Sequence, residues 1–380
     1  MEVFSMIINN AKVYRNGHFE SASIEFDSHI RSFSPGEGMD ACGAYIIPGL
    51  IDVHTHGAMG IDASDCTAEQ IHHLAQFYSD NGVTSFCFTT LTVPADELRS
   101  AMKNIRAYER FGGEAKCTGV HLEGPFVSRG KCGAQNPDNI RKPDIALFNE
   151  LNELSGGMVR LITVAPEVEG ALDFIREASK VCTVSLGHST ADYDQAMAGF
   201  EAGATHVTHL FNGMEPFHHR KPGLVGAALT AGANVELICD GVHIHPAMIV
   251  AVHKMFGDRL IIVSDSLRCA GLCDGRYNLG GLPMIVRDGR ATLLDGTIAG
   301  SSSNLLQELR NVVSYGVPLE VAVKAMTETP AKDIGVFDSI GSLETGKCAD
   351  FLVLNKDLKL MATFIDGKLV NGTTDFESVK

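Results

Sequence analysis

The chain has 380 residues, of which 45% are hydrophobic, so it is long enough for a large core and a second, smaller module. Its formal net charge is −15 and its sequence pI is near 5.4, which argues against nucleic acid or an anionic membrane as the main partner. The start of the chain, MEVFS, lacks a basic region and a long apolar run, and no apolar stretch reaches about 18 residues. We therefore expect neither a signal peptide nor a membrane span.

The distribution of cysteines indicates the cellular compartment. The 10 cysteines are dispersed without a tight framework, and Cys87, Cys182 and Cys239 fall in apolar, strand-like runs. Buried free thiols in a reducing environment account for this pattern. We therefore predict a cytoplasmic protein.

Short alternating β-type segments occupy both ends of the chain. Residues 1–48 contain several such stretches broken by Asn-Gly and Pro-Gly turns, and residues 342–373 show the same pattern. Neither terminal segment is long enough to build a stable sheet alone. We predict one small β-sandwich domain assembled from residues 1–48 and 342–380, and a separate domain over residues 49–341.

Between residues 50 and 335, short apolar runs alternate with longer helical patterns. Helices are predicted over residues 67–80, 95–110, 172–180, 192–202 and 246–256. Continuous apolar runs suit parallel strands that are covered on both faces. The predicted strands end near His54, Thr90, Glu123, Pro166, His188, His209, His243 and Asp265. Strands and helices in this alternation predict an α/β fold, a (β/α)₈ TIM barrel.

Residues with metal-binding side chains lie at or just after these strand ends. His54 and His56 are one residue apart, so on a strand both imidazoles point the same way and can face one ion. In a barrel of parallel strands, catalytic groups gather at this end. The remaining members of the set are Glu123, His188, His209 and Asp265. Zinc and iron take imidazole and carboxylate ligands, so the set predicts a metal-dependent hydrolase.

Asp265 is the terminal acid of the last predicted strand. A carboxylate beside a metal site can accept a proton from water and later pass it to a leaving amine. We therefore predict that Asp265 is the catalytic residue as well as a metal ligand.

Longer motifs surround these residues and carry a resemblance. They read PGLIDVHTHG at 48–57, HLEGPF at 121–126, GHS at 187–189, THLFNGM at 208–214, RKPG at 220–223, DGVH at 240–243, SDS at 264–266, DGTIAGS at 295–301 and GSLETGKCADFLVL at 341–354. Through them the chain resembles the N-acetylglucosamine-6-phosphate deacetylases of the amidohydrolase superfamily over nearly its whole length. The resemblance implies hydrolysis of a linear amide, with a small amino-sugar phosphate as the partner molecule.

Alternatives remain open at this point. One is an enzyme for the galactosamine epimer, an N-acetylgalactosamine-6-phosphate deacetylase, or another amidohydrolase that acts on a cyclic amide. Another is a non-catalytic amidohydrolase-like interaction protein, although such relatives typically lose metal ligands and this chain keeps the full set.

The resemblance also implies a ligand assignment. It places one divalent metal, zinc or alternatively iron, on Glu123, His188 and His209. A second ion would be held by His54, His56 and Asp265, with Glu123 shared, which gives one or two ions per subunit. Many amidohydrolases bridge two metals with a modified lysine on strand four, but the segment LITVAPE at 161–167 has no lysine. Glu123 is expected to take that place.

Substrate-binding residues follow from the same motifs. Asn212, Gly213, Arg220 and His243 match family positions that contact the sugar phosphate. Backbone N–H groups beside a small residue, together with an arginine fork, suit a phosphate. In the family an arginine at this position can come from a neighbouring subunit, so we expect a homodimer.

The chain departs from the family pattern at Gln135. The segment is Gly-Ala-Gln-Asn-Pro at 133–137, where the deacetylases often have a histidine that touches the substrate. Glutamine can donate a hydrogen bond but carries no charge. We expect Gln135 to bind substrate.

By contrast, we expect His121 and His206 to face away from the site in structural roles, and Gly280-Gly281 to form a turn.

Overall fold

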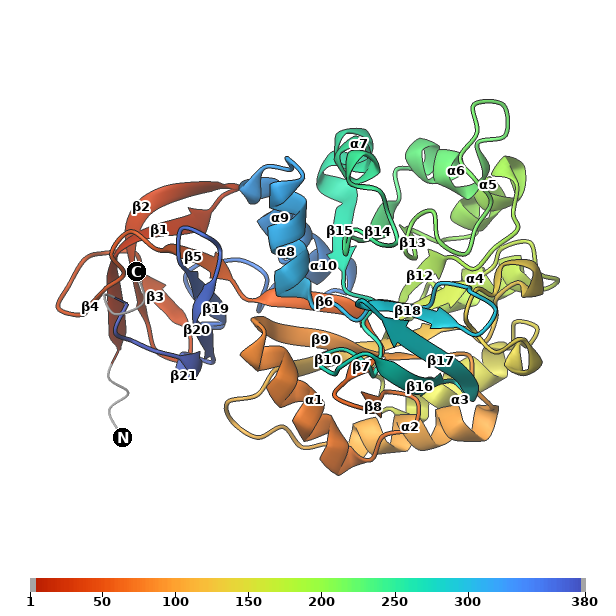
Figure 1. Ribbon diagram of the computed structural model, residues 1–380, viewed down its shortest axis with the longest axis horizontal. Helices are drawn as coiled ribbons and strands as arrows, with labels where there is room; N and C mark the ends of the chain where they lie inside the picture. Colours follow the sequence, from red (N-terminus) through yellow and green to blue (C-terminus); the bar gives the residue numbers. More distant parts are fainter. Residues whose placement is uncertain (1–4, 377–380) are drawn as a thin grey trace.

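The computed structural model describes residues 5–376. The first four residues, on which part of the signal-peptide prediction rests, lie outside this range, as do the last four residues of the predicted terminal domain. Figure 1 shows a strand domain in which the two ends of the chain, red and blue, lie side by side, next to a larger barrel. Within residues 5–376, no helix is long and apolar enough to cross a membrane.

The strand domain is one hydrogen-bonded sheet of eight strands in the order β21-β20-β19-β5-β1-β2-β3, with β4 paired to β1. The Phe26 ring lies 4.9 Å from that of Phe351 and 5.4 Å from that of Phe364, centroid to centroid, so strands from opposite ends of the chain share a core. The sheet therefore folds over on itself in the predicted sandwich. Its strands are β1 (Met6–Arg15), β2 (His18–Phe26), β3 (Ile30–Ser32), β4 (Met39–Asp40), β5 (Tyr45–Pro48), β19 (Phe351–Leu354), β20 (Leu360–Ile365) and β21 (Lys368–Gly372).

The barrel contains eight parallel strands that pair in chain order. They are β6 (Leu50–Thr55), β9 (Val83–Thr90), β10 (Lys116–Glu123), β11 (Val159–Val164), β12 (Thr183–Leu186), β13 (His206–Val207), β14 (Asn234–Ile238) and β15 (Leu260–Val263). This confirms the (β/α)₈ prediction. One predicted strand end is wrong, because β14 ends at Ile238 and His243 lies in the loop beyond it.

The barrel closes where the first strand meets the last. His54 O accepts from Asp265 N–H at 2.9 Å, and His56 N–H donates to Ser266 O at 2.8 Å. Below these bonds, the Ser264 hydroxyl donates to the buried Asp52 carboxylate at 2.5 Å. This seam, formed by residues 52–56 and 264–266, brings two groups of predicted metal ligands together.

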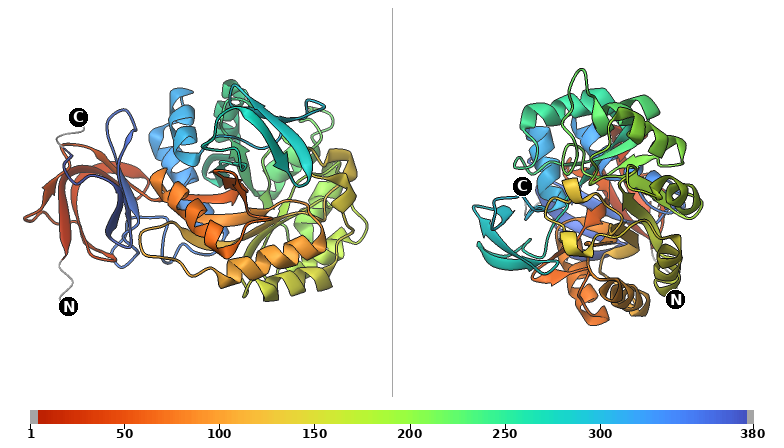
Figure 2. Two further views of the ribbon diagram at one scale, coloured as in Figure 1. Left: turned by 60° about the horizontal axis from the view of Figure 1, so that its bottom comes forward. Right: turned by 90° about the vertical axis from the view of Figure 1, so that its right-hand side faces the viewer.

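Helices cover the outside of the barrel (Figure 2). They are α1 (Ala68–Asp80), α2 (Ala95–Ala107), α3 (Ile145–Leu154), α4 (Ala171–Ala178), α5 (Tyr193–Glu201), α6 (Gly223–Ala231), α7 (Pro246–Phe256), α8 (Leu305–Ser314), α9 (Leu319–Ala325) and α10 (Glu328–Asp333). Short 3₁₀ turns occupy Arg129–Lys131, Pro137–Asn139 and Gly257–Arg259. Helix starts follow capping residues: the Thr67 and Asp192 side chains each accept a backbone N–H in a capping box.

A three-stranded sheet follows the last barrel strand and was not predicted. It consists of β16 (Gly275–Leu279), β17 (Leu282–Arg287) and β18 (Arg290–Leu293), drawn in teal in Figures 1 and 2. The turn between β16 and β17 is Gly280-Gly281, as expected. A small antiparallel pair of strands, β7 (Gly57–Ala58) and β8 (Ile61–Asp62), follows β6, the first barrel strand.

Candidate active site

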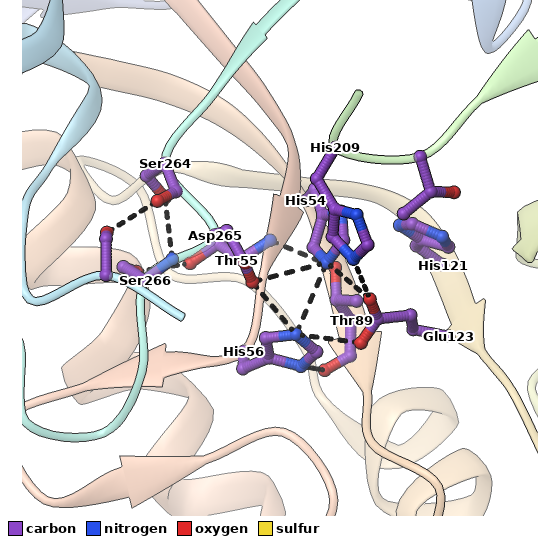
Figure 3. Close-up of polar contacts among 12 residues, drawn as sticks. His54, Thr55, His56, Thr89, His121, Glu123, His209, Ser264, Asp265 and Ser266 are labelled. Carbon is purple, nitrogen blue, oxygen red and sulfur yellow. Dashed lines mark hydrogen bonds and ion pairs between the residues drawn. The ribbon is translucent and has the colours of Figure 1, made fainter. Parts of the chain in front are cut away.

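The predicted metal ligands meet at the carboxyl ends of the barrel strands. The structure places His54, His56 and Asp265 in one cluster and Glu123, His188 and His209 in another, with the ligand atoms of each cluster within 4.8 Å of one another. Figure 3 shows His54 and His56, at the end of β6, converging with Glu123 at the end of β10 and His209 just beyond β13.

Glu123 lies between the two clusters. Its Oε1 is 3.0 Å from His188 Nε2, 2.9 Å from His209 Nε2 and 3.5 Å from His54 Nε2. Its Oε2 is 3.2 Å from His56 Nε2. One carboxylate therefore faces four imidazoles, the position that the sequence assigned to a shared ligand.

The donor atoms fit a divalent cation. Nε2 of His188 and Nε2 of His209 are 3.1 Å apart, and those of His54 and His56 are 3.3 Å apart. Two ring nitrogens can face each other this closely only when a proton or a cation lies between their lone pairs. Because all four rings are buried, a cation shared with the neighbouring carboxylates satisfies them best.

Buried carboxylates control the ionisation of the histidines. Burial lowers the pKa of His54, but the charges of Glu236, Asp265 and Glu123 outweigh it and raise that pKa to about 9. Burial raises the pKa of Asp265, but His54 and His56 outweigh it and bring the pKa below its ordinary value. Asp265 is therefore ionised at neutral pH.

Three of the predicted ligands have a left-handed backbone. The φ angles are 45° at His188, 28° at His209 and 46° at Asp265. Each residue lies two positions beyond its strand, since β12, β13 and β15 end at residues 186, 207 and 263. Residues other than glycine adopt this conformation rarely, and such strain concentrates at functional sites.

A pocket of about 200 Å³ opens beside these clusters. Among the predicted substrate-binding residues, Gln135, Asn212, Gly213 and His243 line it. His243 is held by Asp240 Oδ2 at 2.8 Å on one ring nitrogen and by Ala299 O at 2.7 Å on the other. Because both partners are acceptors, both nitrogens carry protons and the ring is a cation at the pocket wall.

Arg220 does not line this pocket. It is exposed in a neighbouring surface hollow with Glu215, His218 and Lys221, and its Nη1 lies 2.7 Å from His219 Nε2. The single chain therefore does not bring Arg220 to the predicted site.

Comparison with known proteins agrees with this geometry. A model of the amidohydrolase family matches residues 45–370. The N-acetylglucosamine-6-phosphate deacetylase of Vibrio furnissii is 36% identical over 330 residues, which cover 86% of this chain and 82% of that protein. The chain belongs to the amidohydrolase family.

Other relatives share the whole architecture. The N-acetylgalactosamine-6-phosphate deacetylase of Escherichia coli O157:H7 is also 36% identical over 330 residues, covering 86% of this chain and 88% of that protein. A mutant N-acetyl-D-glucosamine-6-phosphate deacetylase from Mycobacterium smegmatis, in complex with N-acetyl-D-glucosamine-6-phosphate, has a TM-score of 0.91 at 30% identity. That match covers 97% of this amidohydrolase and 99% of the solved chain.

Gln135 is fixed on both sides of its amide group in this amidohydrolase. Its Nε2 donates to Glu123 Oε2, and its Oε1 accepts from Thr92 N–H at 2.7 Å. A carboxylate can only accept, so the orientation of the amide follows from its partners. The second N–H of Gln135 remains for a ligand in the pocket, which its side chain lines.

Some pocket residues were missed from the sequence. Residues 297–300 and Leu279 also line the pocket, and both come from segments that follow the last barrel strand. A Cβ at Gly300 would lie 2.5 Å from Asp265 O, so only glycine fits there. The motif DGTIAGS at 295–301 was part of the resemblance, but none of its residues was predicted to line the site.

The prediction that the His121 side chain faces away from the site was wrong. His121 precedes Glu123 by two residues on β10, so both side chains point into the barrel, and the His121 ring lies 4.6 Å from that of His54. His121 is nevertheless structural, since its nitrogens lie near Val53 O and Thr163 Oγ1, at 3.3 and 2.8 Å.

Proposed function

We propose that this amidohydrolase is a metal-dependent deacetylase that hydrolyses the acetamide of N-acetylglucosamine 6-phosphate to glucosamine 6-phosphate and acetate. The observation that carries the proposal is the pair of buried donor clusters meeting at Glu123 beside a pocket. The relatives named above act on amino-sugar phosphates, which supports this substrate class.

The donor chemistry supports a divalent metal. Glu123, His188 and His209 would hold one ion, and His54, His56 and Asp265 a second, with Glu123 shared. We propose zinc, with iron as the alternative, since both accept imidazole and carboxylate ligands. When bound, such a cation polarises an amide carbonyl and lowers the pKa of water.

Asp265 is the proposed proton carrier. Its Oδ1 lies 3.2 Å from His56 Nε2 and 3.4 Å from His54 Nε2, and the residue lines the pocket. As an ionised carboxylate it can take a proton from water. An amine leaves poorly as an anion, so the same carboxyl group then returns the proton to the nitrogen.

The pocket wall supplies polar groups for the sugar. Gln135 can donate its free N–H to the acetyl oxygen. A Cβ at Gly213 would lie 2.9 Å from His188 Nδ1, so its backbone comes close to the site only because it is glycine. The His243 ring, which Asp240 holds at 2.8 Å, lines the same wall and would contact the sugar phosphate.

We propose that Arg220 acts on the phosphate across a homodimer. In one chain its guanidinium lies outside the pocket, so it can serve the pocket of a second copy. This would account for an arginine that matches a substrate-binding position yet is exposed.

All ten cysteines, each within residues 5–376, are free, which supports a cytoplasmic location.

A substrate panel tests the proposal. Acetate release would be measured with N-acetylglucosamine 6-phosphate, the unphosphorylated sugar and N-acetylgalactosamine 6-phosphate. We expect kcat/KM to be highest for the first compound. Equal turnover of the unphosphorylated sugar would contradict the phosphate assignment, and preference for the galactosamine ester would contradict the epimer.

A further inference from the structure

A chain of four buried side chains runs from the metal clusters toward the opposite end of the barrel. His54 Nδ1 lies 2.8 Å from Glu236 Oε2, and Glu236 Oε1 lies 3.1 Å from His206 Nε2 in an ion pair. His206 Nδ1 then lies 2.8 Å from Asp333 Oδ2. The side chains of His54, Glu236 and His206 are fully buried, and that of Asp333 is 2% exposed.

Regular elements carry the inner and outer members of this chain. Glu236 lies in the middle of β14, and Asp333 is the last residue of α10. Asn234, two residues before Glu236 on the same strand, donates to Asp333 Oδ1 at 2.7 Å. Both oxygens of Asp333 are therefore fixed, and the outer end of the chain is anchored.

Glu236 sits between two cationic or proton-donating rings. An isolated carboxylate would be very costly at this depth, so its partners must compensate its charge. Burial lowers the pKa of His206, but Asp333 and Glu236 outweigh it and raise that pKa to about 10. The His206 cation thus balances Glu236 from the side away from the metal clusters.

One oxygen of Glu236 contacts both donor clusters. Glu236 Oε2 accepts from His54 Nδ1–H at 2.8 Å and from the backbone N–H of His209 at 3.1 Å. An ionised carboxylate can only accept, so when a cation takes the place of the Nε2 proton, the remaining proton of His54 must lie on Nδ1. Nε2 of His54, which lies 3.5 Å from Glu123 Oε1 and 3.4 Å from Asp265 Oδ1, would then give its lone pair to a cation shared with these carboxylates. The second bond holds the strained backbone of His209.

We propose that Glu236 is a positioning residue for metal binding, which fixes the tautomer of His54 and the backbone of His209. The inference rests on the proposed function, since it takes both histidines as ligands. Carboxylates that orient ligating histidines contribute about 10- to 100-fold in metal affinity.

Glu236→Gln tests this role, with Glu308→Gln as its matched control. Glu308 is an equally buried glutamate that accepts from Cys239 N–H at 2.7 Å and from no metal-ligand candidate. Zinc stoichiometry and affinity would be measured by metal analysis and chelator competition. We expect Glu236→Gln to weaken the more loosely held ion about 10- to 100-fold, and excess zinc to restore its occupancy. The control should bind zinc like the wild type.

The possible outcomes are distinguishable. Wild-type protein that binds neither zinc nor iron would contradict the proposed function itself. Zinc binding by Glu236→Gln equal to that of wild type would overturn the inference alone. If Glu236→Gln does not fold, Glu236→Asp keeps the buried negative charge but, being one methylene shorter, withdraws the oxygen from His54 Nδ1. We expect the same loss of affinity there, and wild-type affinity would overturn the role of Glu236.

Discussion

At the scale of single residues, the site depends on residues whose backbone is held in an unfavourable conformation. The left-handed backbones of His188, His209 and Asp265 cost on the order of 1–3 kcal/mol each. Hydrogen bonds to distant segments hold the backbone of Asp265: its N–H donates to His54 O at 2.9 Å, and its C=O accepts from Ser301 N–H at 2.7 Å. The strain places these side chains over the mouth of the barrel.

Replacing Asp265 by Asn tests the proton carrier. The introduced amide would keep the size of the side chain and its hydrogen bonding but would not accept a proton. We expect the fold and substrate binding to persist while turnover falls by about a hundredfold or more. Steady-state kinetics with metal content measured in parallel would check this. Near-normal turnover by fully metallated Asp265→Asn would place the general base elsewhere.

Replacing His209 by Ala tests the ligand assignment. The imidazole of His209 contacts Glu123 and His188 at 2.9 and 3.1 Å, so its loss opens the cluster that we assign to the first ion. We expect metal and activity to be lost together, because both depend on the same donor set. Metal analysis and acetate release on the same preparation would show this. A His209→Ala protein that stays both metallated and active would refute the ligand scheme.

At the scale of elements, the sequence predicted regular parts better than irregular ones. The barrel strands and their helices have strong apolar periodicity, and the sequence therefore located both His54 and Glu123 at strand ends. His243 was placed on a strand, but the chain leaves β14 at Ile238 and reaches the pocket through a loop held by Asp240. His243 Nε2 also lies 2.7 Å from the O atom of Ala299, 56 residues away, and no local sequence pattern reports such a contact.

The strands that were not predicted, and Glu236, gave weak signals in the sequence. Strands β16–β18 are short, and two of them are largely exposed on one face, so their apolar pattern is weak. Glu236 was also missed, because a single acid within an apolar run gives no indication of a partner 182 residues away, as His54 is. A contact between distant segments therefore decides the role of Glu236.

A buried acid links α8 to β14 and gives a pH prediction. Burial and the charge of Asp240 raise the pKa of Glu308 well above its ordinary value. The folded protein therefore keeps a proton that the unfolded chain releases above about pH 4.3, so this group lowers the free energy of unfolding as pH rises from there. In Glu308→Gln the side chain does not titrate, so this loss of stability at higher pH is absent.

We therefore expect Glu308→Gln to gain stability relative to wild type as the pH rises from about 4 to 8. Urea unfolding of the metal-free proteins across this range would measure the difference. Parallel pH profiles for the two proteins would mean that Glu308 does not retain its proton in the folded state.

At the scale of the whole molecule, one chain provides the metal clusters and most of the pocket but leaves Arg220 outside. A homodimer with two-fold symmetry would exchange Arg220 between the copies. Mixing Arg220→Ala with Asp265→Asn then tests the exchange. In each mixed dimer, one pocket would contain Asp265 from the first chain and Arg220 from the second.

With random pairing, about half of the dimers are mixed and each has one intact site, so about a quarter of wild-type activity should return. Acetate release before and after subunit exchange would be compared. If activity did not recover in a preparation shown to contain mixed dimers, Arg220 would not serve a neighbouring pocket.

Metal-dependent deacetylation is the central claim, and metal removal tests it most directly. Wild-type protein would be stripped with a chelator, and acetate release from N-acetylglucosamine 6-phosphate would be followed before and after zinc is returned. We predict that release stops in the metal-free protein and recovers with zinc, while circular dichroism shows the fold unchanged. Acetate release at the original rate by protein shown to be free of metal would contradict the account.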